Sequence, residues 1–380
     1  MSATATPPSC APAWRGVRRL LAVRLDSLGD VLMTTPALAA IRHTLPDVHL
    51  GLLTSTAAAP LRPHLPGLDE LIAFDAPWSP GACGADQAGR LLEAMSAELA
   101  RLRYDAAIIF TACTQSALPA AMLCAQAGIG LRLAHCREDP HALLTHRVAD
   151  AETVRTGMRH EVARQLALVA EVGMQAPSVQ LRFRYDAATH LRLEHKLRRA
   201  GVQGGHDCFV VHVGAGAPSH RYPATAFGRA AALVARQSSA LAVFTGSAAE
   251  TDLVEAARAV MDVPSVSLAG ALDVGELGAL IDRARVLVTS HCAPAHIAAA
   301  LGTPVVDLYA LTHPQRTPWS AACRVLNRDV ACRNCLQREC PEGHHACLRG
   351  VVPERVALAA LELMQGTARG TVFPLAPARA

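Results

Sequence analysis

The sequence predicts two α/β domains, each built on a parallel sheet covered by helices. Its length of 380 residues is that of two ordinary domains. Hydrophobic residues make up 51% of the chain and charged residues 18%, which is typical of a globular protein. In both halves, short apolar runs alternate with segments of helical spacing. This alternation favours parallel strands joined by crossover helices.

In the first half, apolar runs predict strands at 20–25, 48–53 and 106–110. Helical spacing or charged helix-forming residues predict helices over 31–43, 87–102, 115–127, 161–172 and 186–199. Pro36 falls within the first of these helices, where it either kinks the helix or starts it as the N1 residue after Thr35. The polar segment 139–156 is expected to be a surface loop.

The second half begins after the glycine cluster at 201–205, which is the expected domain boundary. Beyond it we expect strands at 209–213, 241–245, 266–268, 286–289 and 305–309, and helices at 224–236, 249–260, 273–284, 295–301 and 353–363. Asp273 and Glu276 form a capping-box pattern at the start of one of these helices. The expected organisation is a disordered leader (1–17), an N-terminal domain (18–200), a C-terminal domain (206–352), a terminal helix (353–365) and a disordered tail (366–380).

Charge and segment composition narrow the class of protein. A formal net charge of +4 is too small to indicate nucleic-acid binding. No apolar run approaches the roughly 18 residues that span a bilayer, and the N-terminus lacks the pattern of a secretory signal, so we expect a cytoplasmic protein. There, the twelve cysteines are expected to be free thiols or metal ligands rather than disulfides. Arginines cluster near the N-terminus, at Arg15, Arg18, Arg19 and Arg24. The cluster is either a solvated face or a contact for anionic lipid or phosphate groups.

The first candidate site follows the first predicted strand. Ligands bind open α/β sheets at the carboxyl ends of their strands. Gly29 and Asp30 lie at such an end, between the strand 20–25 and the helix 31–43. Asp30 is either an N-cap, a position that favours aspartate for local reasons, or a functional carboxylate that faces the ligand crevice.

Three further strand exits have side chains suited to ligand binding. The small residues of 213–223 (VGAGAPSHRYP) either let backbone amides approach an anion such as a diphosphate or form a plain tight turn. Glu250, five residues after Thr245, either accepts hydrogen bonds from a ribose diol or stabilises a helix start. In 290–296 (SHCAPAH), His296 lies one turn into a helix, where it is either a structural residue or a ligand contact.

Together, these segments resemble glycosyltransferase family 9, the ADP-heptose:lipopolysaccharide heptosyltransferases. Residues 24–38 (RLDSLGDVLMTTPAL) resemble the opening motif of the family, and 294–304 (PAHIAAALGTP) resemble a motif of its second half. The resemblance covers residues 18 to 365. It implies a GT-B architecture of two Rossmann-like domains, with the acceptor bound by the first and the nucleotide sugar by the second. It also implies an inverting transfer that needs no metal for its chemistry.

The resemblance further implies partners and residue roles. The donor would be ADP-heptose or another nucleotide sugar, and the acceptor a lipopolysaccharide core or related glycan, which would bring the enzyme to the inner face of the inner membrane. Asp30 matches the general base that takes the proton of the acceptor hydroxyl. The residues near the acceptor would be Arg24, Ser27 and Gly29. The donor-binding residues would be Gly214, Ala215, Gly216, Ser219, His220, Arg221, Thr245, Gly246, Glu250, His291, Cys292, Ala293 and His296.

Two departures from the family pattern concern the donor. The lysine that usually precedes the Trp-Pro helix start is absent, so His220 or Arg221 would have to supply the positive charge. The aspartate that would bind the sugar hydroxyls is replaced by His291. These changes leave two alternatives: a different donor sugar or a protein acceptor, and a GT-B-like binding protein without catalysis.

A cysteine-rich segment, 323–347, contains a second candidate site. Cys332, Cys335, Cys340 and Cys347 fall within sixteen residues, a set that suits tetrahedral zinc or iron. A bound iron is reported among related autotransporter heptosyltransferases. The alternatives are reduced thiols or a disulfide, and Cys323 is a spare ligand.

Overall fold

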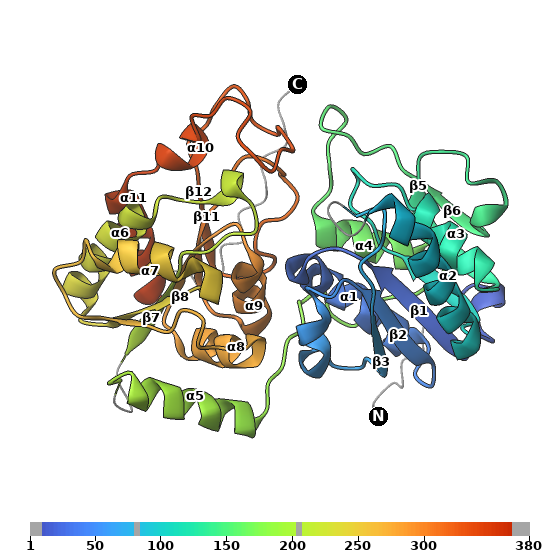
Figure 1. Ribbon diagram of the computed structural model, residues 1–380, viewed down its shortest axis with the longest axis horizontal. Helices are drawn as coiled ribbons and strands as arrows, with labels where there is room; N and C mark the ends of the chain where they lie inside the picture. Colours follow the sequence, from blue (N-terminus) through green and yellow to red (C-terminus); the bar gives the residue numbers. More distant parts are fainter. Residues whose placement is uncertain (1–9, 80–83, 203–206, 367–380) are drawn as a thin grey trace, which may run out of the picture. The chain divides into compact units, whose positions relative to one another are not determined.

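The computed structural model describes residues 10–79, 84–202 and 207–366. The chain forms two compact units, Met1–Leu181 and Arg182–Ala380 (Figure 1). Each unit contains one six-stranded parallel sheet. The predicted α/β class and the two parallel sheets are therefore confirmed.

The sheet of the first unit has the strand order β3-β2-β1-β4-β5-β6. Its strands are β1 (Arg19–Arg24), β2 (His49–Thr54), β3 (Glu70–Ala73), β4 (Ala106–Ile109), β5 (Leu131–Cys136) and β6 (His146–Ala149). Its helices are α1 (Leu28–Thr44), α2 (Ala85–Leu102), α3 (Leu118–Gln126) and α4 (Glu161–Ala170). Helices α1 and α4 pack together, as do α2 and α3. Alternate residues of β1, Leu21 and Val23, belong to the core cluster that includes α3, so Arg24 points to the opposite face.

The sheet of the second unit repeats this topology with the order β12-β11-β10-β7-β8-β9. Its strands are β7 (Cys208–His212), β8 (Leu241–Thr245), β9 (Ser265–Ser267), β10 (Leu287–Ser290), β11 (Val305–Leu308) and β12 (Cys323–Leu326). Its helices are α5 (Ala187–Arg199), α6 (Ala224–Ser238), α7 (Thr251–Arg258), α8 (Val274–Arg283), α9 (Ala293–Leu301), α10 (Ala346–Arg349) and α11 (Pro353–Met364). Helix α6 packs against both α7 and α11, and α8 packs against both α5 and α9.

In both sheets the strand order reverses next to the first strand, between β1 and β4 and between β7 and β10. Such a switch point opens a crevice at the carboxyl ends of the strands. The loop after β1 contains Asp30, and the loop after β7 contains Gly214. The fold therefore places both predicted loops where a doubly wound sheet binds ligands.

Several local predictions differ from the structure. Helix α1 begins at Leu28 and contains Pro36, so the N1 interpretation of this proline is wrong. Helix 249–260 is split into a 3₁₀ turn, Ala248–Glu250, followed by α7. The segment 139–156, expected to be a loop, contains β6 and a 3₁₀ turn, His141–Leu143. Strands β3, β5 and β12 were not predicted, because they are short or mix polar and apolar residues without a clear alternation. A further 3₁₀ turn spans Ala59–His64.

The chain ends and the boundary differ as well. Pro12–Trp14 forms a 3₁₀ turn whose Trp14 is fully buried, so the prediction of a disordered leader is wrong from residue 10 onward. Residues 1–9 and 367–380 lie outside the described residues, as do 203–206 of the boundary region. The division between the units falls before α5 rather than after it. Helix α5 groups with the second unit because it packs against α8.

Candidate active site

Asp30 lies in the first turn of α1, after the carboxyl end of β1. Ser27 is the N-cap, and Asp30, at N3, completes a capping box. The Asp30 carboxylate accepts hydrogen bonds from Ser27 Oγ at 2.6 Å and from the Ser27 amide at 3.2 Å. Asp30 thus stabilises the helix start, but from N3 rather than as the predicted N-cap.

Arg24, at the end of β1, connects this carboxylate to the interior of the first unit. Its guanidinium forms ion pairs with Asp26 at 2.9 Å, Asp30 at 3.3 Å and Glu161 at 2.9 Å. Burial opposes the charge, yet the three carboxylates raise the pKa of Arg24 above its usual value. The side chain is completely buried. The structure thus gives Arg24 a role in holding Asp30, in place of the predicted acceptor contact.

The other two residues predicted near the acceptor differ in exposure. Ser27 is exposed, whereas Gly29 is buried within the first turn of α1. Gln115 Nε2 and Ser55 Oγ both hydrogen-bond to Asp26 in the same loop, at 2.5 and 2.6 Å. The loop after β1 is therefore fixed by contacts to the exits of β2 and β4.

In the second unit, Glu250 lies against the loop after β7. A Cβ atom added to Gly214 would come within 2.3 Å of the Glu250 carboxylate, so a larger residue there would displace this carboxylate from the loop. Glu250 also forms a capping box with Ser247. Burial opposes the charge of Glu250, but hydrogen bonds from Ser247 and Ala215 and the proximity of His212 lower its pKa. The predicted helix-start role is confirmed, and the carboxylate also contacts the predicted phosphate loop.

Ser219 has different partners from those predicted. Its amide donates to the Arg338 carbonyl at 3.1 Å and its hydroxyl to the Gln337 carbonyl at 2.9 Å. Arg338 in turn donates from Nη2 to the Gly216 carbonyl at 3.1 Å. Both donors of Ser219 are used within the protein, so its predicted contact with the donor is left to its hydroxyl oxygen and stays a prediction. The cysteine-rich segment instead packs directly on the 214–219 loop.

Two predicted histidines form a ring stack. His291 stacks on His220 with centroids 4.4 Å apart and on Tyr309 at 4.3 Å. His220 Nε2 also lies 2.9 Å from Thr312 Oγ1. Burial and neighbouring positive groups lower the pKa of His220 to about 4 and that of His291 well below its usual value. The lowered pKa values favour neutral rings at pH 7, which disfavours His220 as the source of the missing positive charge.

The remaining predicted residues lie around these groups. Thr245 Oγ1 is 3.0 Å from His212 Nδ1, and Gly246 follows at the end of β8. Cys292 is the N-cap of α9, with Sγ 3.0 Å from Thr289 Oγ1, and burial raises the pKa of its thiol. Ala293 begins α9, and His296 is buried in it. Arg221 is exposed.

Hydrogen bonds and ring contacts bring the strand exits of the second unit together. The Tyr222 amide donates to Ser290 Oγ at 3.2 Å, which joins the exits of β7 and β10. Sequence reasoning did not single out Tyr309, Arg316 and Arg338, which lie beside these groups. Tyr309 ends a predicted strand, and the strand-exit rule could have found it. No local signal marks the two arginines.

The cysteine-rich segment does not show the predicted four-thiolate set. Within the described ranges, no three His, Cys, Asp or Glu side chains are grouped so that they could hold a metal ion. Cys332 and Cys340 Sγ lie 3.9 and 4.0 Å from the two ring nitrogens of His344. Each described cysteine is a free thiol. The arrangement therefore does not fit tetrahedral coordination by Cys332, Cys335, Cys340 and Cys347.

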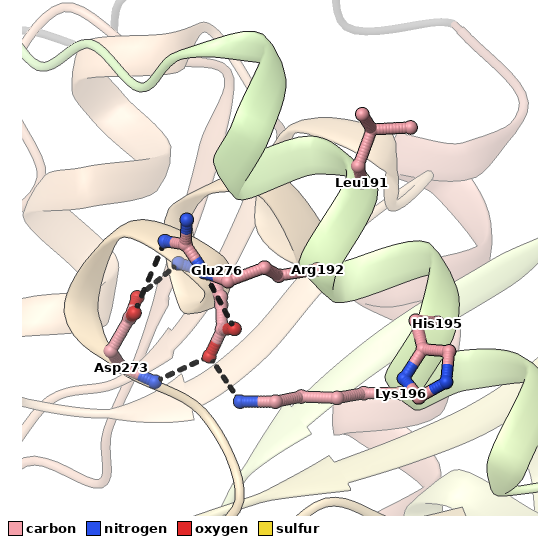
Figure 2. Close-up of a pocket in the computed structure, with 6 residues that line it drawn as sticks. All are labelled: Leu191, Arg192, His195, Lys196, Asp273 and Glu276. Carbon is pink, nitrogen blue, oxygen red and sulfur yellow. Dashed lines mark hydrogen bonds and ion pairs between the residues drawn. The ribbon is translucent and has the colours of Figure 1, made fainter.

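A pocket lies between α5 and the first turn of α8 (Figure 2). Glu276 pairs with Lys196 at 2.6 Å and with Arg192 at 3.4 Å, and Arg192 also pairs with Asp273. The charged groups of the pocket thus pair with one another, and these pairs join α5 to the rest of the second unit. The pocket is lined by Leu191, Arg192, His195, Lys196, Asp273 and Glu276.

Two units, each with a doubly wound parallel sheet and ligand-suited loops at its switch point, are the architecture of the GT-B fold. Residues 93–346 match the sequence model of glycosyltransferase family 9 (heptosyltransferase). The chain belongs to this family and is a glycosyltransferase.

Individual relatives agree. The chain is 26% identical over 297 residues to lipopolysaccharide heptosyltransferase 3 of Escherichia coli, which covers 77% of this chain and 84% of the relative. A family 9 glycosyltransferase of Veillonella parvula superposes with a TM-score of 0.75 at 21% identity, over 92% of this chain and 97% of that one. The E. coli ADP-heptose lipopolysaccharide heptosyltransferase II gives 0.72 at 19% identity, over 92% and 99%. Among the helices that the structure describes, none has the length and apolar character to cross a membrane.

Proposed function

We propose that the protein transfers a heptose from ADP-heptose to a hydroxyl group of a lipopolysaccharide core or related glycan, with inversion at the anomeric carbon. Family membership supports heptose transfer, and the names of the relatives support this donor and acceptor class. The observation that carries the proposal is the pairing of Asp30 with the buried Arg24 at the switch point of the first sheet.

In this mechanism, Asp30 is the general base. It takes the proton of the acceptor hydroxyl while that oxygen forms its bond to the anomeric carbon, and the bond from this carbon to the ADP diphosphate breaks. The electron pair leaves with ADP. Ser27 and Arg24 hold the carboxylate in place, because they contact its two oxygens separately. No metal takes part in this scheme.

The second unit would bind the donor. Glu250 would accept hydrogen bonds from the ribose hydroxyls, and the amides of the 214–217 loop would bind the diphosphate. His291, in the place of the family aspartate, offers a neutral ring rather than a carboxylate to the sugar. This difference favours, as a second candidate, a transferase of the same fold with another donor sugar or a protein acceptor.

The cytoplasmic location and contact with the inner membrane belong to the same proposal. Arg15 and Arg18 are exposed and could meet the phosphates of a lipid-linked acceptor. Arg24, the last residue of the predicted arginine cluster, is buried and is not part of this surface. Vesicle co-sedimentation with anionic lipid, for the wild type and an Arg15→Gln/Arg18→Gln variant, tests this part. Equal sedimentation of the two would contradict it.

A direct assay tests the proposed reaction. Purified protein is incubated with ADP-heptose and a panel of acceptors, namely lipopolysaccharide core, related glycans and proteins, and the products are identified by mass spectrometry. Calorimetry with ADP measures donor binding separately. Heptose on the glycan supports the proposal, and heptose on a protein supports the second candidate. Absence of both turnover and ADP binding would leave the catalytically inactive alternative.

A further inference from the structure

We propose that Arg338, from the cysteine-rich segment, binds the donor diphosphate and supplies the positive charge that the family lysine provides elsewhere. The inference rests on the proposed function, since it concerns the same nucleotide-binding loop. It assigns a ligand contact to a segment that neither the sequence motifs nor the proposed mechanism used.

The 214–219 loop is short of donors for a diphosphate. Ser219 donates both its amide and its hydroxyl to the cysteine-rich segment, and the Ala215 amide hydrogen-bonds to Glu250. Pro218 has no amide hydrogen. In the described part of the chain, the loop amides of Gly214, Gly216 and Ala217 donate to no other group, and they are left for an anion. These donors are neutral and do not balance the charge of a diphosphate, so a nearby cation would strengthen its binding.

The histidines of the site cannot be that cation. His220 is half-buried and His291 is buried, and the lowered pKa of each favours a neutral ring at pH 7. The positive charges of Arg316 and Arg338 contribute to the lowered pKa of His220, which indicates that both guanidinium groups lie near this ring. Lysine is absent from the loop.

Arg338 is positioned for this role. Its Nη2 atom donates to the Gly216 carbonyl, which places the guanidinium on the loop itself. The side chain is exposed, and within the described residues no carboxylate pairs with it. A guanidinium has five N–H donors and binds phosphate oxygens in pairs, so most of its capacity is left for a ligand.

Ser219 explains how the arginine is kept there. Its two hydrogen bonds reach the carbonyls of Gln337 and Arg338, at 2.9 and 3.1 Å, and so fix the backbone that bears the guanidinium. Arg333 provides a contrast within the same segment. It is paired with Asp329 and lies on the exposed surface.

Calorimetry with ADP and adenosine tests the inference. Arg338→Gln is expected to weaken ADP binding about tenfold or more, because hydrogen bonds to charged groups are lost, while adenosine binding is unchanged. Arg338→Lys restores part of the ADP affinity. The matched control, Arg333→Gln, removes the same charge from the same segment and is expected to bind ADP like the wild type.

The outcomes are distinguishable. ADP binding by Arg338→Gln that equals the wild type overturns the inference alone, and so does an equal loss for ADP and adenosine, which would indicate a structural effect. Wild type that binds no ADP overturns both the inference and the proposed function. Wild type that binds ADP through Arg338 but transfers no heptose leaves the inference standing and overturns the proposed function.

Discussion

Both units contain a serine–carboxylate capping box after a strand, but the residues around the two boxes differ. Ser27 and Asp30 form a capping box after β1, and Ser247 and Glu250 form one after β8. Asp30 is 3% exposed and pairs with Arg24, a buried permanent cation. Glu250 is partly exposed and faces His212, whose pKa burial lowers to about 4.

The difference shows what a capping box does and does not determine. It fixes where a carboxylate sits relative to a helix start, because its hydrogen bonds are local. It does not determine which charge the carboxylate meets. A carboxylate held beside a cation suits proton transfer at a fixed position, whereas one beside a neutral ring and a glycine loop suits accepting hydrogen bonds from a ligand.

The largest effect that would sharpen this contrast is expected at Asp30. Asp30→Asn keeps the side-chain shape but removes the proton acceptor. We expect kcat for heptose transfer to fall about 10²–10⁴-fold, with ADP affinity unchanged. Glu250→Gln, in which glutamine can still complete the capping box, is expected to lower ADP affinity and to keep most of kcat. Steady-state kinetics and calorimetry measure the two effects, and an equal fall in kcat for both variants would break the comparison.

The next effect concerns the buried ion pairs around Arg24 in the first unit. In the described part of the second unit, Glu250 has no such network. Glu161 is fully buried and pairs with Arg24. Removing one partner of a buried ion pair leaves a charge uncompensated, so Glu161→Ala should lower the free energy of unfolding by about 3 kcal/mol in urea titrations.

Glu171→Ala is the matched control for this network. Glu171 is exposed at the C-terminal end of the same helix, α4. Its replacement is expected to change the free energy of unfolding by less than about 0.5 kcal/mol. Equal effects of the two variants would show that Arg24 does not depend on Glu161.

A third prediction concerns the loss of folding stability at low pH, which is expected to be larger in the second unit than in the first. His212 has a lowered folded-state pKa, so between its ordinary value of 6.5 and about pH 4 the unfolded chain binds a proton that the folded unit excludes. Stability is therefore lost as the pH falls through this window, by about 1.4 kcal/mol per pH unit for this histidine. His220 and His291 act in the same direction in the second unit, and His135 acts so in the first.

Hydrogen exchange at pH 7 and pH 5 reads this effect for each unit. Peptides of the second unit should lose more protection at pH 5 than those of the first. His212→Gln should reduce the difference, whereas replacing the exposed His190 by glutamine should leave it unchanged. Equal loss of protection in the two units would show that the buried histidines do not dominate the acid response.

The smallest effect tests the caps themselves. Ser27→Ala and Ser247→Ala each remove a capping hydroxyl and should each cost about 1 kcal/mol of stability. Ser27→Ala should also lower kcat, because the hydroxyl holds Asp30, whereas Ser247→Ala should affect ADP affinity. Thermal unfolding and kinetics of the two variants check this. A pair of variants with the same kinetic change would contradict the assigned roles.

Much of the architecture could be predicted because it depends on neighbours in sequence. The strand at 241–245 matches β8, and the Asp273–Glu276 capping box is present as predicted. Short strands such as β3 were missed because their pairing partners, not their own four residues, make them strands. Helix α5 was given to the wrong unit because only its packing on α8 shows where it belongs.

For the site, the positions of Asp30 and of the 214–217 loop could be predicted, since strand exits and glycine spacing are visible in sequence. The environment of each residue could not. Arg24 appears exposed in a cluster of arginines but is buried by carboxylates from α1 and α4. Ser219 appears suited to phosphate, yet its partners lie in a distant segment.

By itself, the sequence determined two α/β units with parallel sheets and ligand loops at the carboxyl ends of their strands, because strand alternation and helix caps act over a few residues. Only the tertiary structure decided which charge each loop meets. Arg338 reaches Gly216 from 122 positions away, and His291 lies stacked between His220 and Tyr309. The strength of a charge and the protonation of a ring depend on burial and on such distant neighbours, and neither is encoded in any one segment of the chain.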